Sequence, residues 1–304
     1  MHAITRITTT IEATQTVAWP HYSGSTLRGA FGRALRQAAC ITEKDNCNGC
    51  PVRNNCAYGV VFEPAPATQA LHPSFQNGLP RYLVQPPPLG ACQLHKGQHQ
   101  TFKVVLLPGS QTHHTMVMHI LKTAVERQLM QPGLFRLTEI KVSEEHLAPL
   151  RSPVLENTSA HLTHSRAHMT LRWLTPLRLQ LQGKPVFKPN TLDATLLIRS
   201  LLLRHLQWCQ LTQQVPINTQ LFTMAATACN LATNNLRWHD IARFSGTQND
   251  KLPMGGLMGS AELEGPVTAL QTLLPLLQMG ELLHIGKEIV MGMGHYHLSA
   301  MQPK

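Results

Sequence analysis

Apolar and polar residues alternate along the start of the chain. Residues 2–13 read HAITRITTTIEA, and this two-residue period predicts a strand whose faces differ in polarity. Short apolar or alternating runs predict further strands at 59–64, 100–109 and 134–144. The first half of the chain therefore contributes several strands to at least one sheet.

A different period marks the helices. Residues 25–39, STLRGAFGRALRQAA, have apolar side chains three and four positions apart, which predicts a helix with Ser25 as N-cap. Residues 114–131 predict a second helix that ends at Pro132-Gly133. The resulting order, β-α-β-β-α-β with insertions, is that of a ferredoxin-like domain.

The same order of elements recurs in the second half without any sequence repeat. The predicted elements are a strand, two helices, two strands, a helix and a last strand, at 168–180, 191–210, 219–232, 235–245, 255–265, 267–280 and 295–299. We therefore predict an α+β protein of two tandem ferredoxin-like domains. The N-terminal domain covers 1–145 with a cysteine-rich insertion, 146–167 is a linker, and the C-terminal domain covers 168–304.

Composition restricts the classes of partner. The 304 residues are 43% hydrophobic and carry a net charge of +10. No apolar run reaches the roughly 20 residues that cross a bilayer, and the N-terminus lacks the apolar block of a signal peptide, so no membrane partner and a cytoplasmic location are expected. The basic excess favours a polyanionic partner.

Four of the seven cysteines lie within seventeen residues: Cys40, Cys47, Cys50 and Cys56. In a reducing compartment such clusters indicate metal ligation more often than disulfides. Four thiolates with no open position favour a structural zinc ion, with an iron–sulfur cluster as the chemical rival and free thiols as the plain alternative.

A glycine-rich run, HIGKEIVMGMGHYHL, occupies residues 284–298. Its position after a helix and before the last strand does not match a dinucleotide-binding fingerprint, and no phosphate-loop motif of the G-x-x-x-x-G-K-[ST] type occurs. Glycines can nevertheless approach a phosphate closely. The sequence therefore predicts contact with an RNA backbone at the residues Gly286, Lys287, Gly292, Gly294, His295 and His297.

The run GELLHIGKEIVMGMGHYHL resembles the terminal glycine-rich motif of the CRISPR-associated RAMP superfamily. STLRGAFGRALRQAAC, the C-x6-C-x2-C-P-x4-C segment before VVFEP, and LRWHDIARFSGTQNDKLPMGGLMGSAELEG extend the resemblance over about residues 20–298. More narrowly, the chain resembles the endoribonucleases that process CRISPR repeat transcripts into guide RNA for antiviral defence.

This resemblance implies repeat-specific cleavage without metal, in which the 2′-hydroxyl attacks the adjacent phosphate and leaves a 2′,3′-cyclic phosphate. It also implies repeat RNA as partner, retention of the guide RNA as an open possibility, and contact with other effector subunits.

The family usually places a histidine in or beside its first helix, and residues 25–39 contain none. The resemblance therefore directs the catalytic prediction to His21, as general base or acid, with Tyr22 assisting and Arg28 or Arg33 stabilising charge. A solvated, non-catalytic His21 and the C-terminal histidines remain alternatives. Arg28, Arg36 and Arg243 are predicted RNA contacts, whereas Trp238 could stack on RNA or belong to the core.

Two rival functions remain at this point. A non-catalytic RAMP subunit that binds guide RNA is favoured by the missing helix histidine. A zinc-binding DNA or regulatory protein is disfavoured because no helix-turn-helix or zinc finger follows the cysteines.

Overall fold

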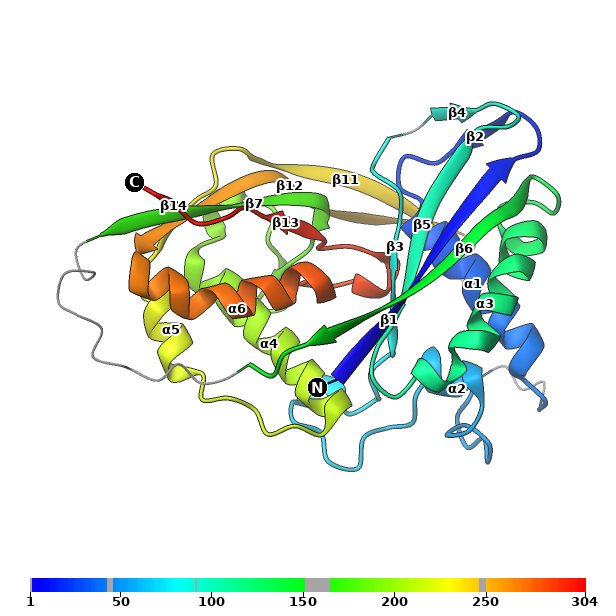
Figure 1. The fold of residues 1–304 in the computed structure, drawn as a ribbon, viewed down its shortest axis with the longest axis horizontal. Helices are drawn as coiled ribbons and strands as arrows, with labels where there is room; N and C mark the ends of the chain where they lie inside the picture. The colour runs from blue at the N-terminus through cyan, green and yellow to red at the C-terminus, as the bar shows by residue number, and fades with distance from the viewer. Residues whose placement is uncertain (1, 43–45, 91, 151–164, 246–249) are drawn as a thin grey trace. The chain divides into compact units, whose positions relative to one another are not determined.

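In the computed structural model, the chain forms two units, each with its own sheet (Figure 1). The structure describes residues 2–42, 46–90, 92–150, 165–245 and 250–304, but not the side chains of 242–253. Unit 1 contains Met1–Ala148, Gln210–Gln213 and Val290–Gly292, and unit 2 contains the rest. Val290–Gly292, in the middle of the glycine-rich run, thus belongs to unit 1.

The four-stranded sheet of unit 1 has the order β3-β5-β1-β6. Its central strand β1 (His2–Ala13) pairs antiparallel with β5 (His99–Leu106) and β6 (Phe135–Leu147), and β3 (Tyr82–Gln85) pairs with β5. In chain order the four strands lie as 4-1-3-2, which is the ferredoxin-like arrangement. A small separate ladder joins β2 (Val17–Trp19) and β4 (Cys92–Leu94).

Two helices, α1 (Gly24–Ala39) and α3 (His114–Thr123), lie against one face of this sheet (Figure 1). The apolar stripe of α1 contributes Leu27, Phe31 and Leu35, each at most 3% exposed, to the core of unit 1. Burial of one such side chain contributes roughly 1.5–3 kcal/mol to folding. One π-helical turn, Ala124–Gln128, continues α3.

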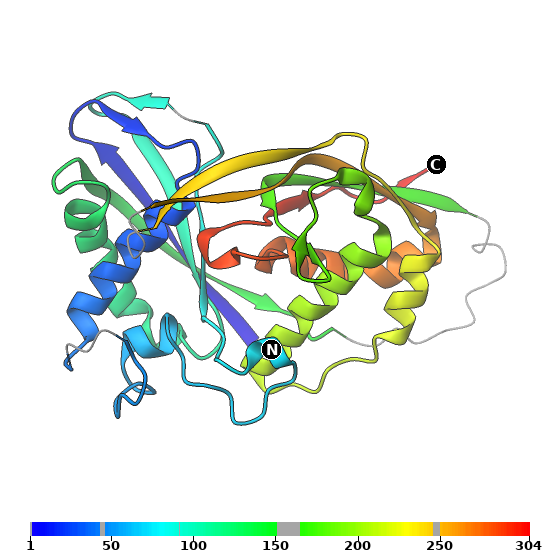
Figure 2. The same ribbon diagram turned by 180° about the vertical axis from the view of Figure 1, so that it is seen from behind.

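Unit 2 repeats this arrangement around β7 (Arg166–Leu177). Its sheet has the order β10-β12-β7-β13, again 4-1-3-2 in chain order when read from β13, and β11 pairs with β12 as a long hairpin. The helices α4 and α6 lie on one face of the sheet (Figure 2). The remaining bounds are α4 (Ala194–Thr212), α5 (Gln220–Thr227), α6 (Val267–Leu283), β8 (Gln180–Leu181), β9 (Lys184–Pro185), β10 (Asn230–Ala232), β11 (Leu236–Ser245), β12 (Asp250–Pro266), β13 (Tyr296–Leu298) and β14 (Gln302–Pro303).

The predicted tandem ferredoxin-like fold is confirmed, but three local predictions are wrong. Residues 59–64 do not form a strand, because the helix α2 (Ala57–Val61) buries all five of its residues. Ser25 is not the N-cap of α1, which begins one residue earlier with Ser23 as N-cap. The helix predicted over 219–232 ends at Thr227, and Asn230–Ala232 pairs with β12 instead.

Most of the predicted linker 146–167 lies outside the described residues. On either side of the gap, β6 ends at Leu147 and β7 begins at Arg166.

Candidate functional site

The glycines of the C-terminal run have positive φ and lie against backbone. Gly286 has φ +87°, and a side chain there would lie 2.5 Å from the Arg178 carbonyl oxygen. Gly294 has φ +72°, and its added Cβ would overlap the Ile285 carbonyl oxygen. Both positions therefore require glycine for two independent reasons, conformation and space.

Backbone N–H groups of this run are engaged within unit 2. The amides of Ile285, Lys287 and Gly294 donate to carbonyl oxygens of Gly294, Arg178 and Pro176 at 3.2, 2.9 and 2.9 Å. These three groups already have protein acceptors, so they do not form an open nest for a phosphate. The Lys287 side chain is exposed and remains the basic group of the run that a phosphate could approach.

The histidines of the run differ in their surroundings. His284 is fully buried, and its ring stacks on that of His295 with centroids 4.5 Å apart and an interplanar angle of 8°. His297 is exposed and lies 2.8 Å from a carboxylate oxygen of Glu281. Tyr296, which stands between His295 and His297, is fully buried. Its hydroxyl donates to the Leu277 carbonyl, and burial raises the pKa of that hydroxyl.

A buried arginine on α4 supports the start of this run. Arg204 on α4 is 6% exposed, and its Nε donates to the carbonyl of Leu283, the last residue of α6, at 2.9 Å. Burial lowers the pKa of Arg204 to about 9. A cation at the C-terminus of a helix is favourable, and here it fixes the end of α6 next to His284.

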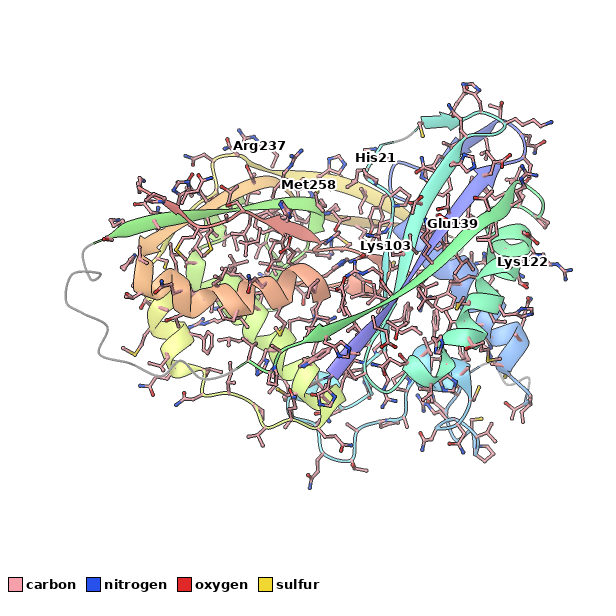
Figure 3. The ribbon with its side chains drawn as sticks, viewed as in Figure 1. His21, Lys103, Lys122, Glu139, Arg237 and Met258 are labelled. Atoms are coloured by element: carbon pink, nitrogen blue, oxygen red, sulfur yellow. The ribbon has the colours of Figure 1, made fainter. Side chains whose placement is uncertain are left out.

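At the other predicted site, His21 precedes α1 and has an exposed side chain (Figure 3). Its backbone carbonyl accepts a hydrogen bond from the Gly90 amide at 3.0 Å. The next residue, Tyr22, is 6% exposed, and its hydroxyl donates to the Met291 carbonyl. The chain therefore holds an exposed imidazole on a backbone that is fixed from two sides.

The three arginines of α1 lie at different positions along the helix axis. Arg28 donates to the Tyr82 hydroxyl at 3.1 Å and lies over the Phe62 ring. Arg33 follows Gly24 by nine residues, about 14 Å along the axis at 1.5 Å per residue. The helix thus separates Arg33 from His21, and Arg28 is the arginine nearest the start of α1.

Arg33 and Arg36 instead line an open pocket of about 400 Å³ together with Gln37 and Cys40. Arg33 donates to the side chain and the backbone carbonyl of Gln128 at 3.1 and 2.8 Å. Arg36 lies over the Tyr58 ring, 5.6 Å from its centroid. Two guanidinium groups at one pocket suit a phosphate.

The cysteine cluster gives no support for the predicted zinc ion. Cys40 and Cys50 each have the Thr42 hydroxyl as neighbour, at 3.7 and 4.0 Å, and the Cys56 thiol donates to the Ala39 carbonyl at 3.5 Å. Burial, followed by the charge of Glu63, raises the pKa of Cys47 to about 11. Among the described residues, no three His, Cys, Asp or Glu side chains could hold a metal ion.

The predicted RNA contact Arg243 lies on β11, opposite Leu252 of β12, but its side chain is outside the described residues. On the same strand, Trp238 packs against Phe187, with ring centroids 4.6 Å apart. Sequence reasoning did not single out Phe187, although a phenylalanine between two lysines and two prolines in KPVFKP was a visible signal.

Two family models match this chain. Residues 2–167 match the AF_1859_N N-terminal domain, and residues 171–296 match the CRISPR-associated endoribonuclease Cas6. No curated protein matches the sequence. In the described residues, no helix has both the length and the apolar character needed to span a membrane.

Solved structures of low sequence identity share the fold over nearly the whole chain. Thermus thermophilus Cas6 is 15% identical with a TM-score of 0.56, and the match covers 98% of this chain and 99% of that one. A Cas6 product complex is 13% identical with a TM-score of 0.54, covering 98% and 100%. An RAMP protein binding different RNA substrates is 8% identical with a TM-score of 0.50, covering 97% and 100%.

The first family model covers more than half of the chain and the second covers most of unit 2. The Cas6 match and the tandem ferredoxin-like fold agree with the motif resemblance. Residues 2–167 thus belong to the family of the AF_1859_N N-terminal domain, and the match of residues 171–296 to the endoribonuclease Cas6 supports the predicted CRISPR-associated endoribonuclease.

Proposed function

We propose that this endoribonuclease cuts CRISPR repeat RNA without metal and that His21 transfers the proton. The observation that carries this proposal is the exposed imidazole of His21 beside the anchored Tyr22, at the start of α1. The Cas6 family match supplies the substrate class, and the solved relatives include product complexes.

In the proposed step, His21 accepts the proton of a ribose 2′-hydroxyl, whose oxygen attacks the adjacent phosphorus. The P–O5′ bond breaks as the P–O2′ bond forms, and the leaving 5′-oxygen takes a proton from solvent. The products are a 2′,3′-cyclic phosphate and a 5′-hydroxyl. Proton transfer by a placed side chain contributes typically ~10²–10⁴-fold to such a rate.

The neighbouring side chains position His21, stabilise charge and bind phosphates of the RNA. The Tyr22 hydroxyl already donates a hydrogen bond to the Met291 carbonyl, so Tyr22 acts by positioning His21. Arg28, exposed and near the start of the same helix, supplies positive charge for the phosphorane. Arg33 and Arg36 bind a more distant phosphate of the RNA at their own pocket. Lys287 makes a further backbone contact.

The proposed partners are repeat RNA and guide RNA, with other CRISPR-associated proteins as assembly partners. One similar solved structure is a Cas6-RT-Cas1–Cas2 complex, where the match covers 98% of this chain and 29% of that one. Its fold likeness supports an assembly partner of this kind for the present chain. A second candidate function, a non-catalytic RNA-binding subunit, is favoured by α1, whose sixteen residues contain no histidine.

One experiment separates the two functions. Purified protein is incubated in EDTA with its repeat RNA, and in parallel with the same RNA carrying a single 2′-deoxy nucleotide before the cut. We expect cleavage of the first RNA only, with a cyclic phosphate on the upstream product. Tight binding of both RNAs without cleavage would assign the chain to the subunit function, and cleavage only after magnesium is added would disprove the metal-free step.

A further inference from the structure

An aromatic pair lies on the surface of unit 2, outside the site described above. Phe187 is 55% exposed, one of the most exposed large apolar residues among the described ones. Its ring packs at 54° on Trp238 of β11, with centroids 4.6 Å apart. Exposing an aromatic ring of this size forgoes the free energy of burying it, so a binding role is the natural explanation.

Trp238 is held firmly in this position. Its Nε1 donates to a carboxylate oxygen of Asp240 at 2.6 Å. On β12, Gly255 leaves room for the indole, because a side chain there would lie 2.7 Å from Trp238 Cζ2. The 3-10 turn Pro189–Thr191, which begins two residues after Phe187, lies against β11. The indole is thus fixed before any ligand arrives, which lowers the entropic cost of stacking.

Positive charge accompanies the pair. Lys184 and Lys188 are exposed and lie three residues before and one residue after Phe187. Arg178 donates to the carbonyl of Gly255, the glycine beside the indole, at 3.0 Å. Asp240, which accepts from Trp238, and Asp193, which accepts from the Leu196 amide at 2.7 Å, add two carboxylates against these three cations. The surroundings of the aromatic pair therefore favour an anionic ligand.

We propose that Phe187 and Trp238 form a stacking platform for one unpaired nucleobase of the RNA substrate, with Lys184 and Lys188 contacting the flanking phosphates. An aromatic surface beside basic side chains is the arrangement by which proteins hold single-stranded nucleotides. The inference rests on the proposed function, because it needs an RNA ligand. It adds to the proposed function a contact in unit 2 that holds an unpaired nucleotide.

Arg237 does not belong to this platform. It is next to Trp238 on β11, so its side chain is on the opposite face of the strand, and Figure 3 shows it pointing outward. Its guanidinium donates to the backbone carbonyls of Asn234 and Leu236. Arg237 is therefore a basic residue of the same strand that lies outside the proposed platform.

The test replaces each unpaired base of the repeat RNA in turn by 2-aminopurine and measures its fluorescence on binding. With the unchanged protein, we expect one position to show strong quenching. Phe187→Ala should abolish that quenching and weaken RNA binding about ten-fold or more. Phe187→Tyr should restore both, whereas Phe187→Leu should not, because stacking needs an aromatic ring.

Met224→Ala serves as the matched control, since Met224 is 59% exposed on α5 of the same unit. It should leave quenching and affinity unchanged, and all variants should keep their melting temperature. The platform is disproved if no unpaired position is quenched, or if Phe187→Leu binds RNA as well as the unchanged protein. It is also disproved if Phe187→Ala keeps its RNA affinity and its quenching and loses only the binding of a protein partner. These results would leave RNA cleavage intact, whereas absence of any RNA binding would remove the proposed function as well.

Discussion

Two loops of this chain look alike as ligand-binding segments in the sequence, yet the structure builds them differently. In the C-terminal run, His284 to Leu298, glycines with positive φ meet backbone carbonyls and amides already have acceptors. In the cysteine segment, Cys40 to Cys56, the thiols are partly exposed, and those of Cys40 and Cys50 share the Thr42 hydroxyl as neighbour. In the first loop the glycines lie directly against backbone atoms, whereas in the second Gly49 has no atom within 4 Å of an added Cβ.

This difference shows which structural feature each of the two motifs requires. The glycines are needed for packing of the run itself, so their presence does not by itself report a phosphate. Any contact with RNA there falls to exposed side chains such as Lys287. The cysteines, in contrast, are a motif only if four thiolates converge, and their described positions do not bring three of them to one ion.

The largest effect should come from Gly294→Ala. The added Cβ meets the Ile285 carbonyl oxygen at φ +72°, so we expect a loss of about 3 kcal/mol or more in unfolding free energy, and loss of RNA binding. The control is Gly49→Ala in the cysteine segment, where φ is +65° but no atom lies within 4 Å of the added Cβ. It should cost only about 1 kcal/mol, from strain alone. Equal losses in urea unfolding would remove the distinction between the two loops.

A smaller effect is expected when all four clustered cysteines are changed to serine. Because no metal group forms among the described residues, the melting temperature should fall by only a few degrees, about 1 kcal/mol for a chain of this size. Elemental analysis of the unchanged protein should find far less than one zinc per chain. Stoichiometric zinc, together with collapse of the serine variant or of chelator-treated protein, would show that the thiols do converge on a metal.

The smallest effect concerns the Cys47 thiol. Its pKa is raised from 9.0 to about 11 in the folded chain, so between these values the unfolded chain loses the proton first. The contribution to stability is therefore complete below pH 9 and is lost as the pH rises to 11. Since the thiol is partly exposed, we expect less than about 1 kcal/mol. Urea unfolding at pH 8 and 10.5 should show a smaller decline for Cys47→Ser, and identical declines would contradict the raised pKa.

Much of the fold could be predicted because two periods dominate it. The stripe of Leu27, Phe31 and Leu35 identifies α1, and the alternation in β1 places Ile7 and Ile11 in the core. Residues 59–64 were mispredicted because five apolar or small residues have no period of their own. Tertiary packing decides there: Gly59 lies against the Arg53 backbone, which favours the compact turn of α2 over a strand.

The candidate site was less predictable than the fold. Sequence spacing placed His21 and Tyr22 before α1, and the structure shows which side chain is exposed and which is anchored. The sequence could not reveal that Arg33 and Arg36 line a pocket together with Gln37 and Cys40, since that depends on how α1 packs. The burial of Arg204 could not be predicted because it depends on Leu283, 79 positions away.

The most direct test of the catalytic proposal is the single-turnover cleavage rate of His21→Ala on repeat RNA in EDTA. We expect the rate to fall by about 10²-fold or more while RNA affinity stays unchanged, because His21 acts on the proton and not on binding. His95→Ala, an exposed histidine on the turn before β5, is the matched control and should cleave normally. A His21→Ala variant that cleaves at the unchanged rate would contradict the assignment of His21 as the catalytic residue.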